Sequence, residues 1–136
     1  MLSKRSEYAL KALGYLAGKF GEGPQLISQI SKSKKIPLKF LELILLDLKY
    51  AGIVDSKKGK GGGYFLLHHP KKTSIAEVIR IESGPIALLS CVSVNFYKKC
   101  KDCNEATCGL NKVMKATRDA TLKVLEKKTI ADLIDQ

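Results

Sequence analysis

The stretch from Ile36 to Leu67, IPLKFLELILLDLKYAGIVDSKKGKGGGYFLL, decides the expected fold. Its first half predicts a helix from Pro37 to Ala51, since proline suits a first helical turn and a glycine commonly follows the last one. Four aliphatic residues recur at helical spacing and predict its buried face: Leu41, Ile44, Leu45 and Leu48. The second half predicts strands at Ile53–Val54 and Tyr64–Leu67, joined by a loop over 55–63 with three lysines and four glycines. A helix followed by a basic hairpin is typical of a winged helix-turn-helix.

The preceding segment predicts the rest of that motif. Ser3 or Ser6 can cap a helix that ends near Phe20. Its buried stripe should comprise Ala9, Ala12, Leu13, Leu16, Ala17 and Phe20. Gly21–Pro24 predicts a turn, and a short helix follows over about Ser28–Lys34. A short helix, a polar turn and a longer amphipathic helix form a helix-turn-helix.

The charge is concentrated in this half of the chain. Residues 1–72 hold 14 Lys/Arg and 5 Asp/Glu, a net +9, whereas residues 73–136 hold 10 and 8, a net +2. On a winged helix-turn-helix such an excess predicts phosphate binding, with double-stranded DNA as the partner. The predicted DNA-contacting residues are Lys4, Arg5, Ser33, Lys34, Pro37, Leu38, Lys39, Phe40, Glu42, Lys57, Lys58, Gly59, Lys60, Gly61, Gly62 and Tyr64. Glu42 either accepts a hydrogen bond from a base amino group or pairs with Lys39.

Four cysteines predict a second kind of chemistry. Cys91, Cys100, Cys103 and Cys108 fall within 18 residues of a polar loop. An intracellular chain seldom uses structural disulfides, so the cluster favours metal or iron–sulphur ligation, with thiol redox sensing as the alternative. Zinc and iron–sulphur clusters both accept four thiolates, and the cysteine count does not separate them.

The last long helix is predicted over Gly109–Lys128. One side carries a stripe expected to form a homodimer interface: Leu110, Val113, Met114, Thr117, Thr121, Val124 and Leu125. A symmetric dimer presents two recognition helices to a palindromic operator, with half-sites about one DNA turn apart, ~34–36 Å.

Several motifs resemble the IscR/NsrR-type family of bacterial winged helix-turn-helix transcriptional regulators. They are Tyr8–Leu10, Phe40–Glu42, Leu48–Val54, Ser56–Tyr64, Ile75–Arg80, Gly84–Leu88 and Thr129–Leu133. The resemblance implies a homodimer on promoter DNA and an iron–sulphur cluster, [2Fe-2S] or [4Fe-4S], with Cys91 as first ligand and Cys108 as last. Cys100, Cys103 or both stand between them, so the ligand set is either all four cysteines or three with a further ligand from elsewhere. The chain departs from the family at Lys58, Lys60 and Leu43, where relatives often carry arginine, proline and a polar base-reading residue.

Together these features predict a mainly α fold with a small β wing, a winged helix-turn-helix domain plus a long C-terminal dimerisation helix. The predicted regions are the DNA-binding region 1–72, a connecting helix and turn 73–90, a cysteine-rich sensor loop 91–108, and a dimerisation helix and tail 109–136. The connecting helix should begin at Ser74, which forms a capping-box pattern with Glu77. No apolar run is long enough for a membrane helix and no signal core follows the N-terminus, so we expect a cytoplasmic protein without a membrane partner.

The expected function is therefore a transcriptional repressor that senses iron–sulphur, redox or nitric oxide status. The alternative is a basic winged-helix RNA-binding protein, or a zinc-binding structural protein without a sensor role. An enzyme is not expected: the segment Lys60–Gly63 lacks the Gly-Lys-Ser/Thr of a phosphate loop and precedes a strand. The adjacent His68 and His69 fit an exposed linker better than a metal site, because neighbouring side chains on an extended segment point apart.

Overall fold

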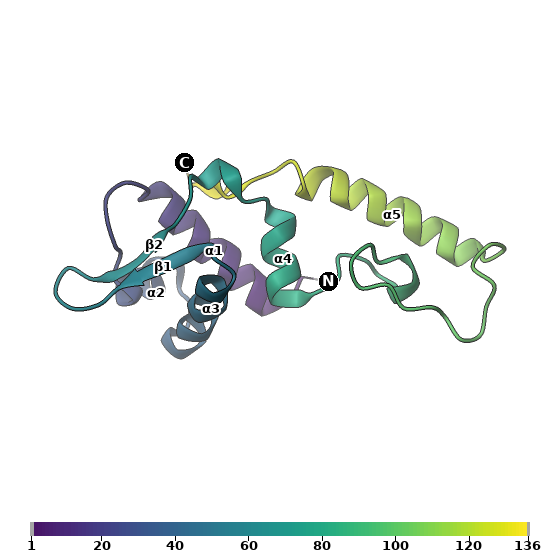
Figure 1. The fold of residues 1–136 in the computed structure, drawn as a ribbon, viewed down its shortest axis with the longest axis horizontal. Helices are drawn as coiled ribbons and strands as arrows, with labels where there is room; N and C mark the ends of the chain where they lie inside the picture. Colours follow the sequence, from purple (N-terminus) through teal and green to yellow (C-terminus); the bar gives the residue numbers. More distant parts are fainter. Residues whose placement is uncertain (1, 136) are drawn as a thin grey trace.

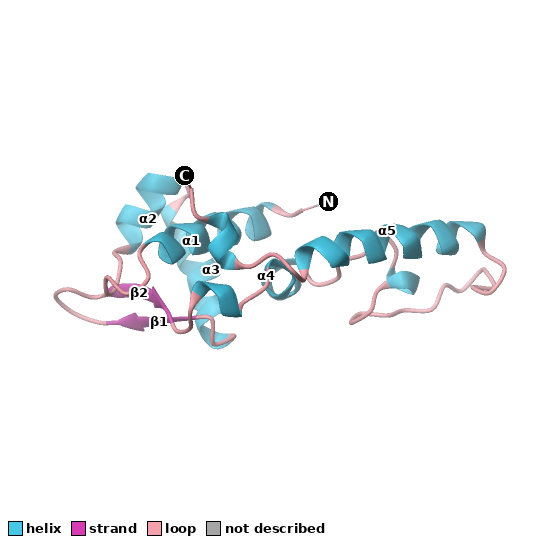
Figure 2. Ribbon diagram, turned by 90° about the horizontal axis from the view of Figure 1, so that it is seen from above, coloured by secondary structure: helices cyan, strands magenta, loops and turns pink. Residues whose placement is uncertain are grey.

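The computed structural model describes residues 2–135 and consists mainly of helices (Figures 1 and 2). Helices α1 (Lys4–Gly18), α2 (Ile27–Lys34) and α3 (Leu38–Tyr50) pack together, and strands β1 (Val54–Lys57) and β2 (Gly63–Leu66) form an antiparallel hairpin beside them. Helix α4 (Ile75–Ser83) leads to the cysteine segment, and α5 (Gly109–Leu125) extends away from the winged body (Figure 1). Short 3-10 helices occur at Pro70–Lys72, Ser90–Val92 and Ile130–Leu133. The predicted fold class, mainly α with a small β wing, is confirmed.

The core lies where the helical spacing predicted it. Leu41, Ile44, Leu45 and Leu48 of α3 are all fully buried, in one cluster with the small and aliphatic face of α1. Alanines on α1 let the helices approach closely, and the larger α3 side chains fill the space between them. Truncating such a buried aliphatic side chain to alanine typically costs about 2–5 kcal/mol. The core thus fixes which face of α3 remains outside.

The element ends differ from the sequence prediction at a few residues. Helix α1 is capped by Ser3, whose hydroxyl accepts the Ser6 N–H at 3.1 Å, but it ends at Gly18 and leaves Phe20 exposed. The prediction that Phe20 is buried was wrong, because a tight turn after Gly18 carries its ring off the stripe and against His69. Helix α3 starts at Leu38 with Pro37 as its N-cap, and α5 ends at Leu125.

The wing hairpin is longer than predicted, because β1 continues through Ser56 to Lys57. Its register pairs Val54 with Leu66 and Lys57 with Gly63. Gly63 has φ of +144°, and a Cβ there would lie 2.2 Å from the carbonyl oxygen of Gln25. The Gln25 backbone exchanges hydrogen bonds of 2.8 and 2.9 Å with Tyr64, so the absence of a side chain at Gly63 lets the loop before α2 bind the wing.

The C-terminal segment returns to the winged body. Ile130 is buried in the main core, and its N–H donates to the Thr73 carbonyl at 3.1 Å. Leu133 lies so close to α1 that a Cβ on Gly14 would be 2.7 Å from its carbonyl oxygen. The segment 130–133, which follows α5, therefore anchors the end of that helix to the main core of the winged body.

Candidate nucleic-acid interface and cysteine cavity

The outer face of α3 is free of protein contacts that would bury it. The predicted DNA-contacting residues of this region are all exposed: Pro37, Leu38, Lys39, Phe40 and Glu42. Phe40 also packs edge-to-face on Tyr8, with ring centroids 5.5 Å apart. No ion pair joins Lys39 to Glu42 among residues 2–135, so the Glu42 carboxylate is free to accept a hydrogen bond from outside the chain.

The wing carries an exposed lysine cluster. Lys57, Lys58 and Lys60 are exposed, as are Gly59 and Gly61, and Tyr64 is half-buried at the root of the hairpin. None of the three lysines forms an ion pair within the described residues. The remaining predicted wing residue, Gly62, is buried in the turn, where a Cβ would lie 2.2 Å from the Lys57 carbonyl oxygen. The structure gives Gly62 a role in closing the turn.

The remaining predicted DNA contacts differ in their exposure and in whether they form ion pairs within the chain. Ser33 is exposed at the end of α2, and Lys4 is exposed with a surface ion pair to Glu7 at 3.3 Å. Lys34 pairs with Asp135, near the C-terminus. The exposed Lys4–Glu7 pair contributes little to stability, whereas the Lys34 side chain is half-buried.

Arg5 is held between two other helices. Its Nη2 donates to the Asp47 carboxylate on α3, and its Nε donates to Oε2 of Glu82 on α4 at 2.9 Å. The Glu82 side chain is fully buried, and its Oε1 has no hydrogen-bond partner in the described structure. Burial raises the pKa of Glu82, the Arg5 hydrogen bond lowers it, and the Asp47 charge raises it, with a net upward shift. Arg5 of α1 thus connects α3 and α4, through partners that lie 42 and 77 residues away in the sequence.

The four cysteines line one cavity of about 280 Å³. All four are free and half-buried, and the wall is completed by Leu89, Ser90, Lys98, Lys99, Leu110 and Asn111. The structure thereby brings the predicted ligands Cys91, Cys100, Cys103 and Cys108 together. Within residues 2–135, however, no three His, Cys, Asp or Glu side chains are placed tightly enough around one point to hold a single metal ion.

Asn111 joins the two ends of the cysteine segment. Its side-chain amide donates to Cys91 Sγ and its backbone N–H donates to Cys108 Sγ, each at 3.4 Å, and the residue is 2% exposed. Two turns further along α5, Arg118 Nη1 donates to the Val92 carbonyl at 2.7 Å. These bonds attach the cysteine segment to α5. Sequence reasoning missed Asn111 and Arg118, since nothing in their local pattern indicates which loop the helix faces.

Cys100 and Cys103 interact directly. A backbone hydrogen bond from Asp102, followed by one with the Cys103 thiol, lowers the pKa of Cys100. Sharing that hydrogen bond with Cys100 raises the pKa of Cys103 to about 12. The pair therefore titrates as a unit in which Cys100 loses its proton first.

Helix α5 has two faces. Asn111 and Leu122 are buried, with Met114, Arg118 and Leu125 half-buried, so Met114 and Leu125 of the predicted stripe partly face inward. The rest of the predicted stripe is exposed: Leu110, Val113, Thr117, Thr121 and Val124. Each threonine hydroxyl donates to a carbonyl of its own helix, at 3.1 and 2.9 Å, which leaves the exposed surface apolar.

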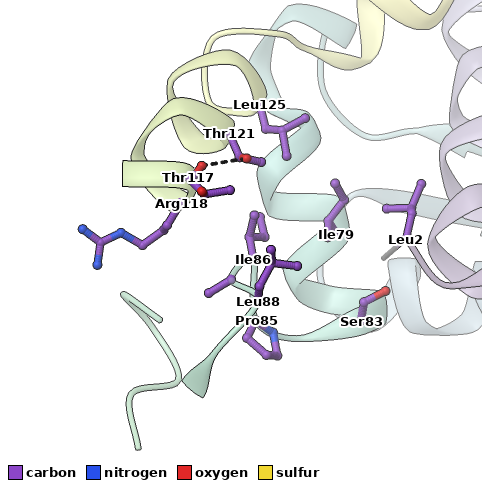
Figure 3. A pocket seen from close by; sticks show the side chains of 11 residues that line it. Leu2, Ile79, Ser83, Pro85, Ile86, Leu88, Thr117, Arg118, Thr121 and Leu125 are labelled. Carbon is purple, nitrogen blue, oxygen red and sulfur yellow. Dashed lines mark hydrogen bonds between the residues drawn. The ribbon is translucent and has the colours of Figure 1, made fainter. Parts of the chain in front are cut away.

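An apolar pocket of about 230 Å³ borders this exposed stripe (Figure 3). It lies between α4, the segment 85–88 and α5. Its lining includes Leu2, Ile79, Pro85, Ile86, Leu88 and Leu125, with Thr117 and Thr121 shared with the stripe. The sequence did not predict this pocket, because its lining comes from α4, the segment 85–88 and α5, which meet only in the folded chain.

The fold and the exposed basic surface define a winged-helix DNA-binding transcriptional regulator. The model of the Rrf2 family, described as an iron-dependent transcriptional regulator, matches residues 2–136, and the chain belongs to that family. It is not an enzyme. Within the described residues no helix has the length and apolar character needed to cross a membrane.

Individual relatives agree with this assignment. An Rrf2-like HTH-type transcriptional regulator of Rhodobacter capsulatus is 41% identical over 98% of this chain and 92% of its own length. The structure of CymR, the global cysteine regulator of B. subtilis, superimposes with a TM-score of 0.82, at 28% identity, over 99% of this chain and 98% of that chain. T. potens IscR gives a TM-score of 0.75 at 26% identity, over 98% and 85% of the two chains. The predicted resemblance to IscR/NsrR-type regulators is thus confirmed.

Proposed function

We propose that this protein acts as a homodimeric repressor on a palindromic promoter operator, with α3 in the major groove and the wing on the backbone or in the minor groove. The observation that carries the proposal is the exposed surface formed by the outer face of α3 and by the wing lysines, which have no ion pair within residues 2–135. An α-helix fits the major groove of B-DNA, and lysines nearby supply phosphate contacts. The proposed interface consists of the predicted contacts that are exposed: Lys4, Ser33, Pro37, Leu38, Lys39, Phe40, Glu42 and the exposed residues of the wing.

The dimer is proposed to form through the exposed stripe on α5. Three large apolar side chains on it, Leu110, Val113 and Val124, each expose more than half of their surface. The adjacent pocket at Thr117 and Thr121 enlarges the apolar area available to a symmetry mate. Two copies joined there would present two α3 helices, as a palindrome requires.

The operator is best found by selection. Anaerobically purified protein is incubated with a random duplex pool, and bound DNA is amplified and sequenced. The proposal expects an inverted repeat with half-sites one helical turn apart. Selection of single-stranded RNA in a parallel pool, or enrichment of no DNA motif, would instead favour the RNA-binding alternative.

The cysteine cavity is proposed to hold an iron–sulphur cluster, with zinc as the alternative. In number and chemistry the four thiols fit either group, and the cavity is larger than a single ion needs. The family's description as iron-dependent favours iron. A bound cluster would supply a centre sensitive to oxygen or nitric oxide, as the resemblance implies. Cys91 and Cys108 are the proposed terminal ligands, with Cys100, Cys103 or both between them.

Signalling is proposed to act through the join between the cysteine segment and α5. Asn111 donates hydrogen bonds to Cys91 and Cys108, and Arg118 donates one to Val92. A rearrangement of the cysteine segment would therefore shift α5, the helix proposed to dimerise. A change of loop state can alter DNA affinity only if the two DNA-binding arrangements bind the ligand differently. Operator affinity of loaded and stripped protein should therefore differ by roughly 5–150-fold. Equal affinities would leave the cavity with a structural role only.

A further inference from the structure

The outer face of α3 is unusually apolar for a surface that meets DNA. Alongside Lys39 and Glu42 it carries Leu43, 56% exposed, and Leu46, 39% exposed. The opposite face is the fully buried core stripe, so packing within the chain does not explain these leucines. Lys39, Leu43 and Leu46 follow one another at spacings of four and three, which places them along one line of the helix surface.

The surroundings of Leu43 indicate what covers it. Lys39 lies one turn before it, and the wing hairpin that carries Lys57, Lys58 and Lys60 belongs to the same winged body (Figure 2). A hydrophobic protein partner would have to leave these cations unpaired, whereas duplex DNA supplies phosphates for them. The occupant is therefore the major groove of DNA. This step depends on the proposed function, in which α3 is the recognition helix.

The major groove offers an aliphatic side chain only one strong apolar partner. Base edges there present hydrogen-bond donors and acceptors, apart from the C5-methyl group of thymine. Leucine has no donor or acceptor, and covering a donor or acceptor without a replacement partner is unfavourable. We propose that Leu43 is a specificity-determining residue that contacts a thymine methyl group in each half-site, with Leu46 extending the same apolar surface.

The neighbouring carboxylate sharpens the inference. Glu42, adjacent in sequence and without an ion pair in residues 2–135, can accept a hydrogen bond from a cytosine or adenine amino group. A leucine and a glutamate side by side thus select a thymine next to a base that bears an amino group. Neither residue supplies the bidentate contact by which arginine selects guanine.

Replacing thymine by uracil tests the proposal, since the only change is loss of the methyl group. Each thymine of the selected operator is replaced symmetrically in both half-sites, and affinity is measured by fluorescence anisotropy at fixed salt. At one position the wild type should lose about four-fold per methyl group, or about fifteen-fold for both half-sites. Leu43→Ala should bind thymine and uracil operators equally at that position, while the exposed Leu67→Ala control should discriminate like the wild type.

The outcomes separate this proposal from the broader function. If uracil is tolerated at every position while the inverted repeat is still bound, or if Leu43→Ala retains the methyl preference, thymine selection by Leu43 is refuted and the DNA-binding function stands. If the wild type selects no duplex, both are refuted. Leu43→Gln gives a second check: glutamine pairs with adenine, so this variant should shift the preferred base at the same position from thymine toward adenine.

Discussion

Removing the two wing lysines that lie nearest the hairpin tip gives a quantitative test of how the wing meets DNA. Lys58 and Lys60 are exposed and unpaired within the described residues, so their replacement by alanine leaves the folded core untouched. Each phosphate contact contributes about 0.9 to the slope of log affinity against log salt. If each lysine meets one phosphate, a homodimer loses four contacts and its slope falls by about 3.6.

The size of this change also reports how many wings are engaged. When salt rises four-fold, from about 50 to 200 mM, a slope difference of 3.6 means that the wild type loses roughly 150-fold more affinity than the double variant. With only one wing on DNA the slope falls by about 1.8 and the difference is roughly twelve-fold. Fluorescence anisotropy titrations of Lys58→Ala/Lys60→Ala against operator DNA at four salt concentrations measure both quantities.

A matched control removes the same charge elsewhere. Lys123, in the last turn of α5, and Lys127, just after that helix, are exposed and are not among the predicted DNA contacts, and α5 lies apart from the wing hairpin (Figure 1). Their double alanine variant should keep the wild-type slope. Equal slopes for the wing variant and the wild type would refute wing contact with phosphates, and equal losses in both double variants would mean that only net charge matters.

Three further predictions address the wing, the buried carboxylate and the dimer. Gly63→Ala should destabilise the protein by roughly 1–3 kcal/mol in urea unfolding, because positive φ and a backbone clash both oppose a side chain; Gly109→Ala, where nothing lies within 4 Å, should cost nothing. Burial raises the pKa of Glu82 in the folded protein above 4.5, so folding favours the protonated carboxyl group. The stability that this group contributes is therefore present at low pH and is lost as the pH rises through the folded pKa. The stability of wild type relative to Glu82→Gln should fall over that range, and a pH-independent difference would contradict the assignment. Val113→Glu should yield monomers by sedimentation velocity and weaken operator binding. Lys115→Glu, at an exposed position on the side of α5 away from the stripe, should remain dimeric. A dimeric Val113→Glu would exclude the proposed stripe.

The parts of the fold that the sequence predicted are those set by local pattern. Helical spacing on α3 selected the four residues that are fully buried, and the glycine-rich basic loop indicated the hairpin. The strand ends were less accurate because Ser56 and Lys57 have no strong strand preference, and their pairing depends on the partner strand. The burial of Phe20 was predicted from periodicity alone, which cannot detect where a helix stops.

The parts that were not predicted depend on contacts between distant residues. Arg5 was expected on DNA because of its charge, yet its partners Asp47 and Glu82 lie 42 and 77 residues away. Asn111 and Arg118 gain their roles only when α5 packs beside the cysteine segment. Clustering predicted that four cysteines act together, but the residue that holds Cys91 to Cys108 required the structure.

The most direct test of the central claim is the composition of the cysteine cavity. Protein purified without oxygen is measured by visible absorption together with iron, inorganic sulphide and zinc content per chain. The account predicts a coloured protein containing iron and sulphide, with the chromophore abolished by serine at Cys91 or Cys108 and the middle ligand identified by single changes at Cys100 and Cys103. A colourless protein with one tightly bound zinc per chain, or a metal-free protein whose DNA affinity responds to peroxide and recovers with a thiol, would contradict it.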